Sequence, residues 1–187
     1  MSDEGGQDAA EMIPPGCGMW FAWLFASTLG SFLGWILAWR ASFVVPGVFS
    51  IITLGLVMGV VIGVLQWLVL RAHFKGAGWW IIASGLGWAA GFPVGAALAQ
   101  QLGLTGYLFG VVLGLATGAA VGVAQWLVLR RRASRAMVWI PASIFAWTSS
   151  LLYYRPQGSG IGVMYGLLSG IVTGVALLWL LYRPSAE

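Results

Sequence analysis

The amino-acid sequence predicts an all-α integral membrane protein, a bundle of about six transmembrane helices made of three tandem two-helix hairpins in a pseudo-threefold arrangement. Three observations lead to this fold class. Apolar residues make up 60% of the 187 residues and charged residues only 7%, whereas soluble domains carry about 25% charged residues. Apolar stretches long enough to cross a bilayer follow one another along the chain, and a nine-residue motif recurs within them.

A helix needs about 20 apolar residues to cross about 30 Å of hydrocarbon, and six stretches of the chain meet this requirement. The expected spans are 19–39, 47–70, 79–100, 107–129, 137–154 and 161–182. The fifth fits least well, because it is short and contains Pro141. Turn residues such as Pro46-Gly47 and Gly103 separate the spans. The apolar runs are unbroken rather than alternating, which argues against membrane β-strands.

The two ends of the chain differ in composition from the spans. Four of the five carboxylates lie in residues 1–18, which we expect to form a mobile acidic tail before a membrane domain at 19–183, and 184–187 form a C-terminal tail. Residues 1–16 lack the basic n-region and the cleavage site of a secretory signal, so the first span is expected to stay as an uncleaved anchor. The single cysteine, Cys17, is interpreted as a small residue at the membrane edge.

Basic residues predict the orientation, because cytoplasmic loops carry an excess of Lys and Arg. Seven basic residues follow even-numbered spans, on the side shared with both termini, and two follow odd-numbered spans. We therefore expect both termini to be cytoplasmic. The seven are Arg71, Lys75, Arg130, Arg131, Arg132, Arg135 and Arg183, and the two are Arg40 and Arg155.

Internal similarity defines the repeating unit. Residues 63–71 read Gly-Val-Leu-Gln-Trp-Leu-Val-Leu-Arg, and residues 122–130 differ from them at one position, 59 residues later. Odd-numbered spans share a Trp-x-x-Ala-Ser motif, which begins at Trp23, Trp80 and Trp139. Each unit therefore contains two spans, and every copy enters the membrane in the same direction. The repeats cover about 19–75, 76–135 and 136–183.

The third copy is degenerate. Its last residues, 178–183, keep the Trp and Arg of the nine-residue motif, with Leu178 in place of the Gln, and about three residues of the span are missing.

Glycines recur every four residues in the even-numbered spans, which places them on one stripe of each helix. Such stripes let helix backbones approach closely, so we expect spans two, four and six to pack against one another with the Trp-rich odd spans outside. The stripes consist of Gly55, Gly59 and Gly63; Gly110, Gly114, Gly118 and Gly122; and Gly166, Gly170 and Gly174.

Two glutamines, Gln66 and Gln125, are the best candidates for a polar site in the membrane, since they occupy equivalent repeat positions one turn inside the cytoplasmic interface. A buried amide needs partners, and an interhelical hydrogen bond is favoured over a bound ligand. Lipid-headgroup or interface anchors are expected at Arg71, Arg130, Arg131, Arg132, Arg135, Trp67 and Trp126, where an arginine can reach lipid phosphates or stack on an indole.

Indoles near span ends are expected to keep their rings in the interface and their N–H groups wet. These are Trp20, Trp39, Trp67, Trp79, Trp80, Trp126, Trp139 and Trp179.

Catalysis is not expected. The spans contain no acid–base pair, activated nucleophile or phosphate loop, and His73, the only histidine, cannot build a metal site alone. We therefore predict no catalytic residue, metal or cofactor, although an Mg-porphyrin bound through water or an amide stays open. The basic residues follow the membrane topology and do not indicate nucleic-acid binding.

The repeated Gln-Trp-Leu-Val-Leu-Arg and Trp-x-x-Ala-Ser motifs resemble those of a widespread set of mostly uncharacterised bacterial six-span membrane proteins, over nearly all of residues 19–183. The resemblance implies a bacterial inner-membrane location and carries over no functional residue. Two functions remain. The first is a structural or accessory subunit, which docks through Trp-rich outer faces onto other subunits of a respiratory or photosynthetic assembly. The alternative is a transporter or channel for a small neutral or lipidic molecule.

Overall fold

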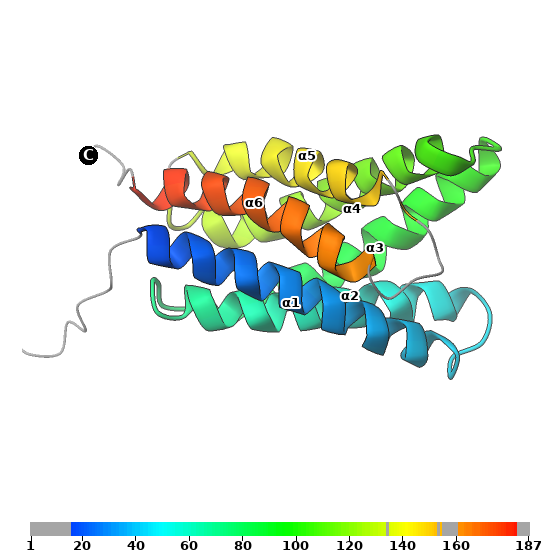
Figure 1. The fold of residues 1–187 in the computed structure, drawn as a ribbon, viewed down its shortest axis with the longest axis horizontal. Helices are drawn as coiled ribbons and strands as arrows, with labels where there is room; N and C mark the ends of the chain where they lie inside the picture. The colour runs from blue at the N-terminus through cyan, green and yellow to red at the C-terminus, as the bar shows by residue number, and fades with distance from the viewer. Residues whose placement is uncertain (1–15, 134, 153, 155–160, 183–187) are drawn as a thin grey trace, which may run out of the picture.

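The computed structural model describes residues 16–133, 135–152, 154 and 161–182, and this part of the chain is helical, without a strand. The helices are α1 (Cys17–Ser42), α2 (Val48–Leu70), α3 (Trp79–Gln101), α4 (Gly106–Leu129), the 3₁₀ turn η1 (Ala136–Val138), α5 (Trp139–Leu151) and α6 (Ile161–Tyr182). They run alternately in opposite directions, so α1 begins and α6 ends at the same end of the bundle (Figure 1).

Five of these helices, all except α5, are long and apolar enough to cross a membrane. Their outward faces are apolar as well, and Phe21 and Phe25 of α1 are 64% and 68% exposed. A helix that is apolar on all sides belongs in a protein core or in a lipid bilayer. The helices and their surface therefore indicate a multi-pass membrane protein.

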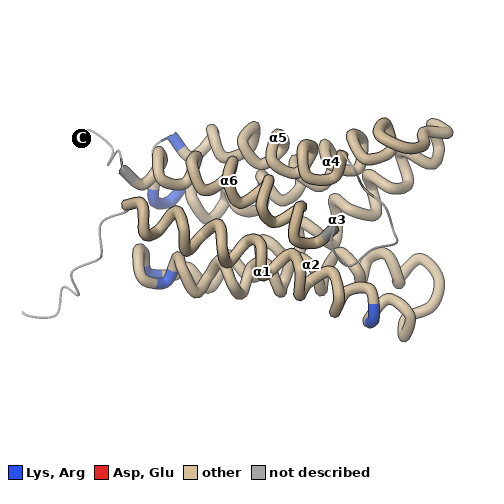
Figure 2. The backbone as a smooth tube through the Cα atoms, viewed as in Figure 1, with Lys and Arg blue, Asp and Glu red and all other residues tan. Residues whose placement is uncertain are grey.

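Charged residues lie at the ends of the bundle (Figure 2), and the described part of the chain contains no Asp or Glu. Most of the basic residues follow α2 and α4, at the end where α1 begins; we call this the basic end. Arg40 lies in the last turn of α1, at the opposite end. Arg155 and Arg183 lie outside the described residues, as do residues 1–15 of the expected acidic tail and all of the expected C-terminal tail.

The first and fifth helices differ most from the sequence prediction. The first runs from Cys17 to Ser42 rather than from 19 to 39. The fifth ends at Leu151, three residues early, and its α-helical part begins only at Trp139. Pro141 has no N–H to donate to the carbonyl of Met137, so the preceding residues form the 3₁₀ turn instead, in which Val138 N donates to Arg135 O at 3.1 Å. The 3₁₀ turn and α5 together are shorter than the other apolar helices.

Glycine permits one of the tight connections. α3 ends in a turn in which Gly103 has a φ of +64°, a conformation that costs little only without a Cβ. There Leu104 N donates to Ala99 O at 2.9 Å, the hydrogen bond of a Schellman motif. The chain thereby reverses within four residues before α4 begins.

The helices form a closed ring in which each packs mainly against the two that precede and follow it, and α6 packs back against α1. The expected packing of the even-numbered helices against one another is therefore wrong. In a ring of alternating odd and even helices, the neighbours of an even helix are odd ones.

The glycine stripes do bring helices together, but each stripe faces the odd helix of the next hairpin. A Cβ built on Gly63 of α2 would lie 2.9 Å from the Cβ of Ser84 in α3. The same contact joins Gly122 to Ser143, between α4 and α5, and Gly170 to Ser27, between α6 and α1, each at 3.0 Å. The other glycines of each stripe likewise meet backbone or side chains of that odd helix. Three junctions between hairpins are thus built alike.

Candidate functional site

Three tryptophans fill the interior of the bundle near the basic end. Trp23, Trp80 and Trp139 begin the Trp-x-x-Ala-Ser motifs of α1, α3 and α5, and their exposed fractions are 0%, 0% and 1%. Their rings meet edge to face, with centroid distances of 5.8, 6.3 and 5.4 Å, an arrangement favoured by the aromatic quadrupole. Because alternate helices of a ring meet only at its centre, these rings close the centre. We call them the tryptophan triad.

The triad corrects an expectation from the sequence. Trp80 and Trp139 do not place their N–H groups in the interface; both indoles are buried. Proximity to the end of a helix did not reveal which side of that helix faces the bundle.

Gln66 joins three helices through its amide. The indole N–H of Trp80 in α3 donates to Gln66 Oε1 at 2.9 Å, and Gln66 Nε2 donates to Ser27 Oγ in α1 at 3.0 Å. All three side chains are buried. One amide from α2 thus links both neighbouring helices inside the bundle, where an unpaired donor is costly.

Gln125 repeats this arrangement one hairpin later. Trp139 Nε1 in α5 donates to Gln125 Oε1 at 2.9 Å, and Gln125 Nε2 donates to Ser84 Oγ in α3 at 2.9 Å. The two glutamines therefore make interhelical hydrogen bonds, the interpretation favoured by the sequence. Neither lines the pocket described below.

At the third junction the equivalent residue is Thr173 of α6, three residues after Gly170. The indole N–H of Trp23 donates to Thr173 Oγ1 at 3.0 Å, and the threonine hydroxyl donates to Ser169 O at 2.6 Å. The sequence placed Leu178 at this position because it aligned Trp179 with the repeated tryptophan. The glycine contacts show that the correct register is five residues earlier.

The substitution leaves one polar atom without a partner. A threonine has no amide N–H to donate to the preceding helix. Ser143 Oγ of α5, the counterpart of the two serines that accept from glutamine, is buried with no hydrogen-bond partner. The hydrogen-bond network of the triad is therefore complete at two junctions and incomplete at the third.

Arginines predicted as anchors lie over indole rings. The guanidinium carbon of Arg71 is 5.3 Å from the ring centroid of Trp67, and that of Arg130 is 5.1 Å from Trp126, within the range of a cation–π interaction. The sequence prediction of stacking one turn along the helix is confirmed for these two pairs.

The other two predicted arginine anchors with a described partner differ from this pattern. Arg135 lies over Trp179 at 5.9 Å, and Arg132 Nη2 donates to the backbone O of Lys75 at 2.7 Å, joining the two loops at the basic end.

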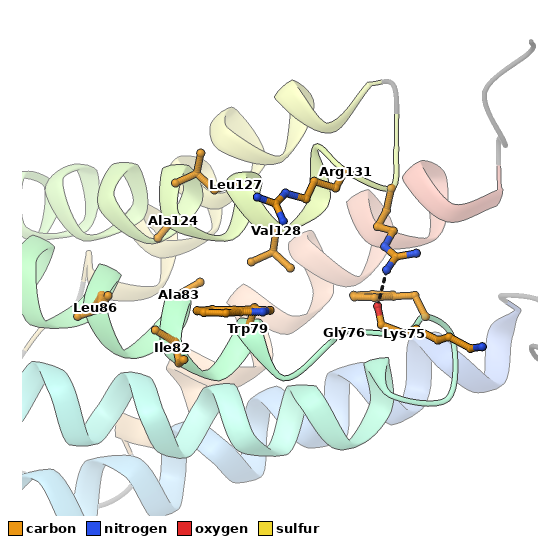
Figure 3. A pocket seen from close by; sticks show the side chains of 12 residues that line it. Lys75, Gly76, Trp79, Ile82, Ala83, Leu86, Ala124, Leu127, Val128 and Arg131 are labelled. Carbon is orange, nitrogen blue, oxygen red and sulfur yellow. Dashed lines mark hydrogen bonds between the residues drawn. The ribbon is translucent and has the colours of Figure 1, made fainter.

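A pocket of about 660 Å³ opens at the basic end, between the start of α3 and the end of α4. This volume is typical of small-molecule sites. Figure 3 shows Arg131 extending from the end of α4 toward Trp79, whose ring lies on the opposite wall. The lining residues are Phe74, Lys75, Gly76, Trp79, Ile82, Ala83, Leu86, Ala124, Leu127, Val128, Arg131 and Arg132.

Sequence reasoning missed both the triad and the pocket. The Trp-x-x-Ala-Ser motif was read only as evidence of repetition, although its Trp and Ser are the partners of the glutamines. One sequence feature does mark the pocket. The two nine-residue motifs differ only at Leu65 and Ala124, and Ala124 lies in the pocket wall.

The interior is also aromatic toward the opposite end of the bundle. Trp88 and Trp147 meet edge to face at 4.7 Å, within a core cluster that also contains Trp35 and Tyr165. Buried polar atoms without a hydrogen-bond partner occur near the middle of the helices, on Ser31 and Thr117 and on the indole nitrogen of Trp88.

Metal-ligating side chains do not gather anywhere in the described residues: no three His, Cys, Asp or Glu lie together there. Compared with known protein families, with curated proteins and with solved structures, the chain matches none.

Proposed function

We propose that the protein is a non-catalytic subunit of a larger assembly in a bacterial inner membrane, where it has a structural or accessory role. The tryptophan triad carries this proposal. It occupies the centre of the ring with three indoles, and the glutamines beside it bond to neighbouring helices. The interior is thus used to hold the helices together, which leaves the outer surface for interactions.

The proposal includes a pseudo-threefold arrangement of three hairpins that span the membrane six times, with both termini in the cytoplasm. The three similar glycine–serine contacts support the symmetry. The grouping of basic residues at the end where α1 begins supports the orientation, since basic loops stay on the cytoplasmic side. α5 is the span on which the proposal depends most, because it is the shortest.

The docking surface that we propose differs from the one expected from the sequence. Of the twelve tryptophans in the chain, six are buried and three, Trp39, Trp79 and Trp179, are exposed, so fewer tryptophans face outward than the sequence suggests. The large exposed aromatics of the helices include phenylalanines, among them Phe21 and Phe25 of α1 and Phe145 of α5. We therefore propose that partner subunits dock on these phenylalanine-bearing faces.

Photocrosslinking in native membranes tests this proposal. A photoreactive phenylalanine analogue at Phe25 or Phe145, both more than 60% exposed, is expected to capture one defined membrane protein in high yield. The same analogue at Val94, a 53% exposed position of α3, samples a face without these aromatics. Crosslinks to lipid alone from all three positions, together with a single species in native purification, would contradict the subunit role.

Transport of a small neutral or lipidic molecule is the second candidate, and one observation favours its lipidic form: the pocket on the side of the α3–α4 hairpin has an apolar wall and a basic mouth. Flux assays in liposomes test it. If transport ran along the axis, the double variant Gln66→Leu, Gln125→Leu would change the flux. Unchanged flux would remove both glutamines from the mechanism.

A further inference from the structure

The pocket at the basic end is basic at its mouth and apolar along its wall. Its mouth carries Lys75, Arg131 and Arg132, while its wall is formed by Ile82, Leu86 and Leu127, which are 49%, 61% and 49% exposed. In a membrane, this wall faces the acyl region and the mouth lies at headgroup depth. An amphiphile with an anionic head matches both parts.

The cations at the mouth have no carboxylate to neutralise them, since the described part of the chain contains no Asp or Glu. Arg132 is held by its hydrogen bond to the Lys75 carbonyl, drawn in Figure 3. Arg131, by contrast, extends into the pocket opposite Trp79, and the side chains of Lys75 and Arg131 are exposed. An exposed indole at headgroup depth next to an arginine is well suited to a phosphate ester, which accepts from guanidinium and ammonium groups.

A comparison of the first and second hairpins shows which pocket residues are particular to the second. Over the nine-residue motif the two hairpins differ only at Leu65 and Ala124, and Ala124 lines the pocket. After the shared arginine, the first hairpin continues with Ala72-His73, where the second has Arg131-Arg132. Over residues 122–132 the second hairpin therefore differs from the first by a smaller residue, Ala124, and two added cations, and all three line the same pocket.

We infer that this pocket binds an anionic glycerophospholipid from the leaflet at the basic end. The phosphate lies at the mouth beside Arg131, and one acyl chain follows the groove between α3 and α4 over Leu86 and Leu127. Of the predicted lipid anchors, this assigns a specific site to Arg131 and Arg132. Arg71 and Arg130 keep their contacts with indoles. The site does not depend on whether the protein is a subunit of an assembly.

Native mass spectrometry of the full-length, delipidated protein in detergent tests the inference. Added phosphatidylglycerol is expected to bind with a stoichiometry of one at low micromolar concentration, and phosphatidylcholine at least tenfold more weakly. Arg131→Ala should weaken phosphatidylglycerol binding about fivefold, the effect of one basic residue near an anionic surface. Ala124→Leu, which restores the residue of the first hairpin, should abolish binding by filling the groove.

The matched control is Arg130→Ala, which removes the same charge one residue away but leaves the pocket lining intact, and it should change binding less than twofold. Equal weakening by Arg130→Ala and Arg131→Ala would overturn the inference, because it would mean attraction to the basic end as a whole. Undiminished binding to Ala124→Leu would overturn it too. Competition by glycerol phosphate, a headgroup without chains, would show that the site binds a soluble phosphate and not a lipid.

Discussion

The junction between α6 and α1 differs from the other two junctions of the ring in the side chain that bonds to the triad indole. At the α2–α3 and α4–α5 junctions a glutamine accepts from a triad indole on the following helix and donates to a serine on the preceding helix. At the α6–α1 junction Thr173 accepts from Trp23 but does not reach Ser143. The glycine contacts are nevertheless alike at all three junctions.

This difference separates the two kinds of interaction that hold the ring. Close glycine contacts occur at every junction, whereas the glutamine bridge is absent at the third. Helices in lipid associate mainly through close packing, and single interhelical hydrogen bonds contribute about 0.6 kcal/mol on average. We therefore expect packing to contribute most of the stability of each junction and the hydrogen bonds to contribute a smaller part.

The largest effect is expected from a glycine substitution at a complete junction. A Cβ on Gly59 would lie 2.7 Å from the Cβ of Trp88, so Gly59→Leu must push α2 away from α3 and should lower the free energy of unfolding by about 3 kcal/mol. Titration of the detergent-solubilised protein with SDS measures it. Gly18→Leu is the matched control, since nothing lies within 4 Å of a Cβ at Gly18. A loss for Gly59→Leu no larger than for Gly18→Leu would refute the close contact.

A smaller loss is expected from Gln125→Leu, which breaks both hydrogen bonds of one bridge and leaves the Trp139 indole and the Ser84 hydroxyl unpaired. Two such bonds amount to about 1–2 kcal/mol in a membrane, and the same SDS titration measures the change. The indole environment provides a second readout, because Trp139 fluorescence should change when its acceptor is removed. Gln101→Leu, at an exposed position, should change neither quantity. A Gln125 variant as stable as the native chain would show that packing alone holds this junction.

The smallest effect, and the only gain, is expected from completing the third bridge. Thr173→Gln supplies an amide that can accept from Trp23 and donate to Ser143, and it should raise the free energy of unfolding by about 0.6 kcal/mol. The gain should vanish in a Ser143→Ala background, because the acceptor is then absent. A gain that persists without the serine hydroxyl would come from packing, and the three junctions would then not be interchangeable.

The sequence was sufficient to predict an apolar, all-helical bundle and the approximate positions of its helices. The apolar runs and the motif that recurs after 59 residues depend only on order along the chain. The partners of the stripes were mispredicted, because a four-residue glycine spacing specifies a face of one helix and not the helix that lies against it. That choice depends on closure of the ring.

For a related reason, the sequence predicted the two glutamines of the candidate site but not their partners. Gln66 and Gln125 stand out as polar residues in apolar spans. Their partners belong to the repeated Trp-x-x-Ala-Ser motif, but they lie on other helices, and nothing in the order of the chain pairs them with the glutamines. The equivalence of Thr173 to the two glutamines was harder to predict, because Trp179 and Arg183 match the end of the repeated motif in a different register. Burial and contact distances are needed to separate such a coincidence from true equivalence.

Closure of the ring between α6 and α1 has a consequence for biosynthesis. Trp23 and Thr173 are 150 residues apart, whereas Trp80 and Gln66 are separated by 14. At about 5–20 residues per second, the first helix waits roughly 10–30 s in the bilayer before its last partner is made. During that time its indole N–H and the face that later receives the α6 glycines remain open to other proteins. Insertion factors or a neighbouring nascent chain have their best opportunity to bind there, before the last helix arrives.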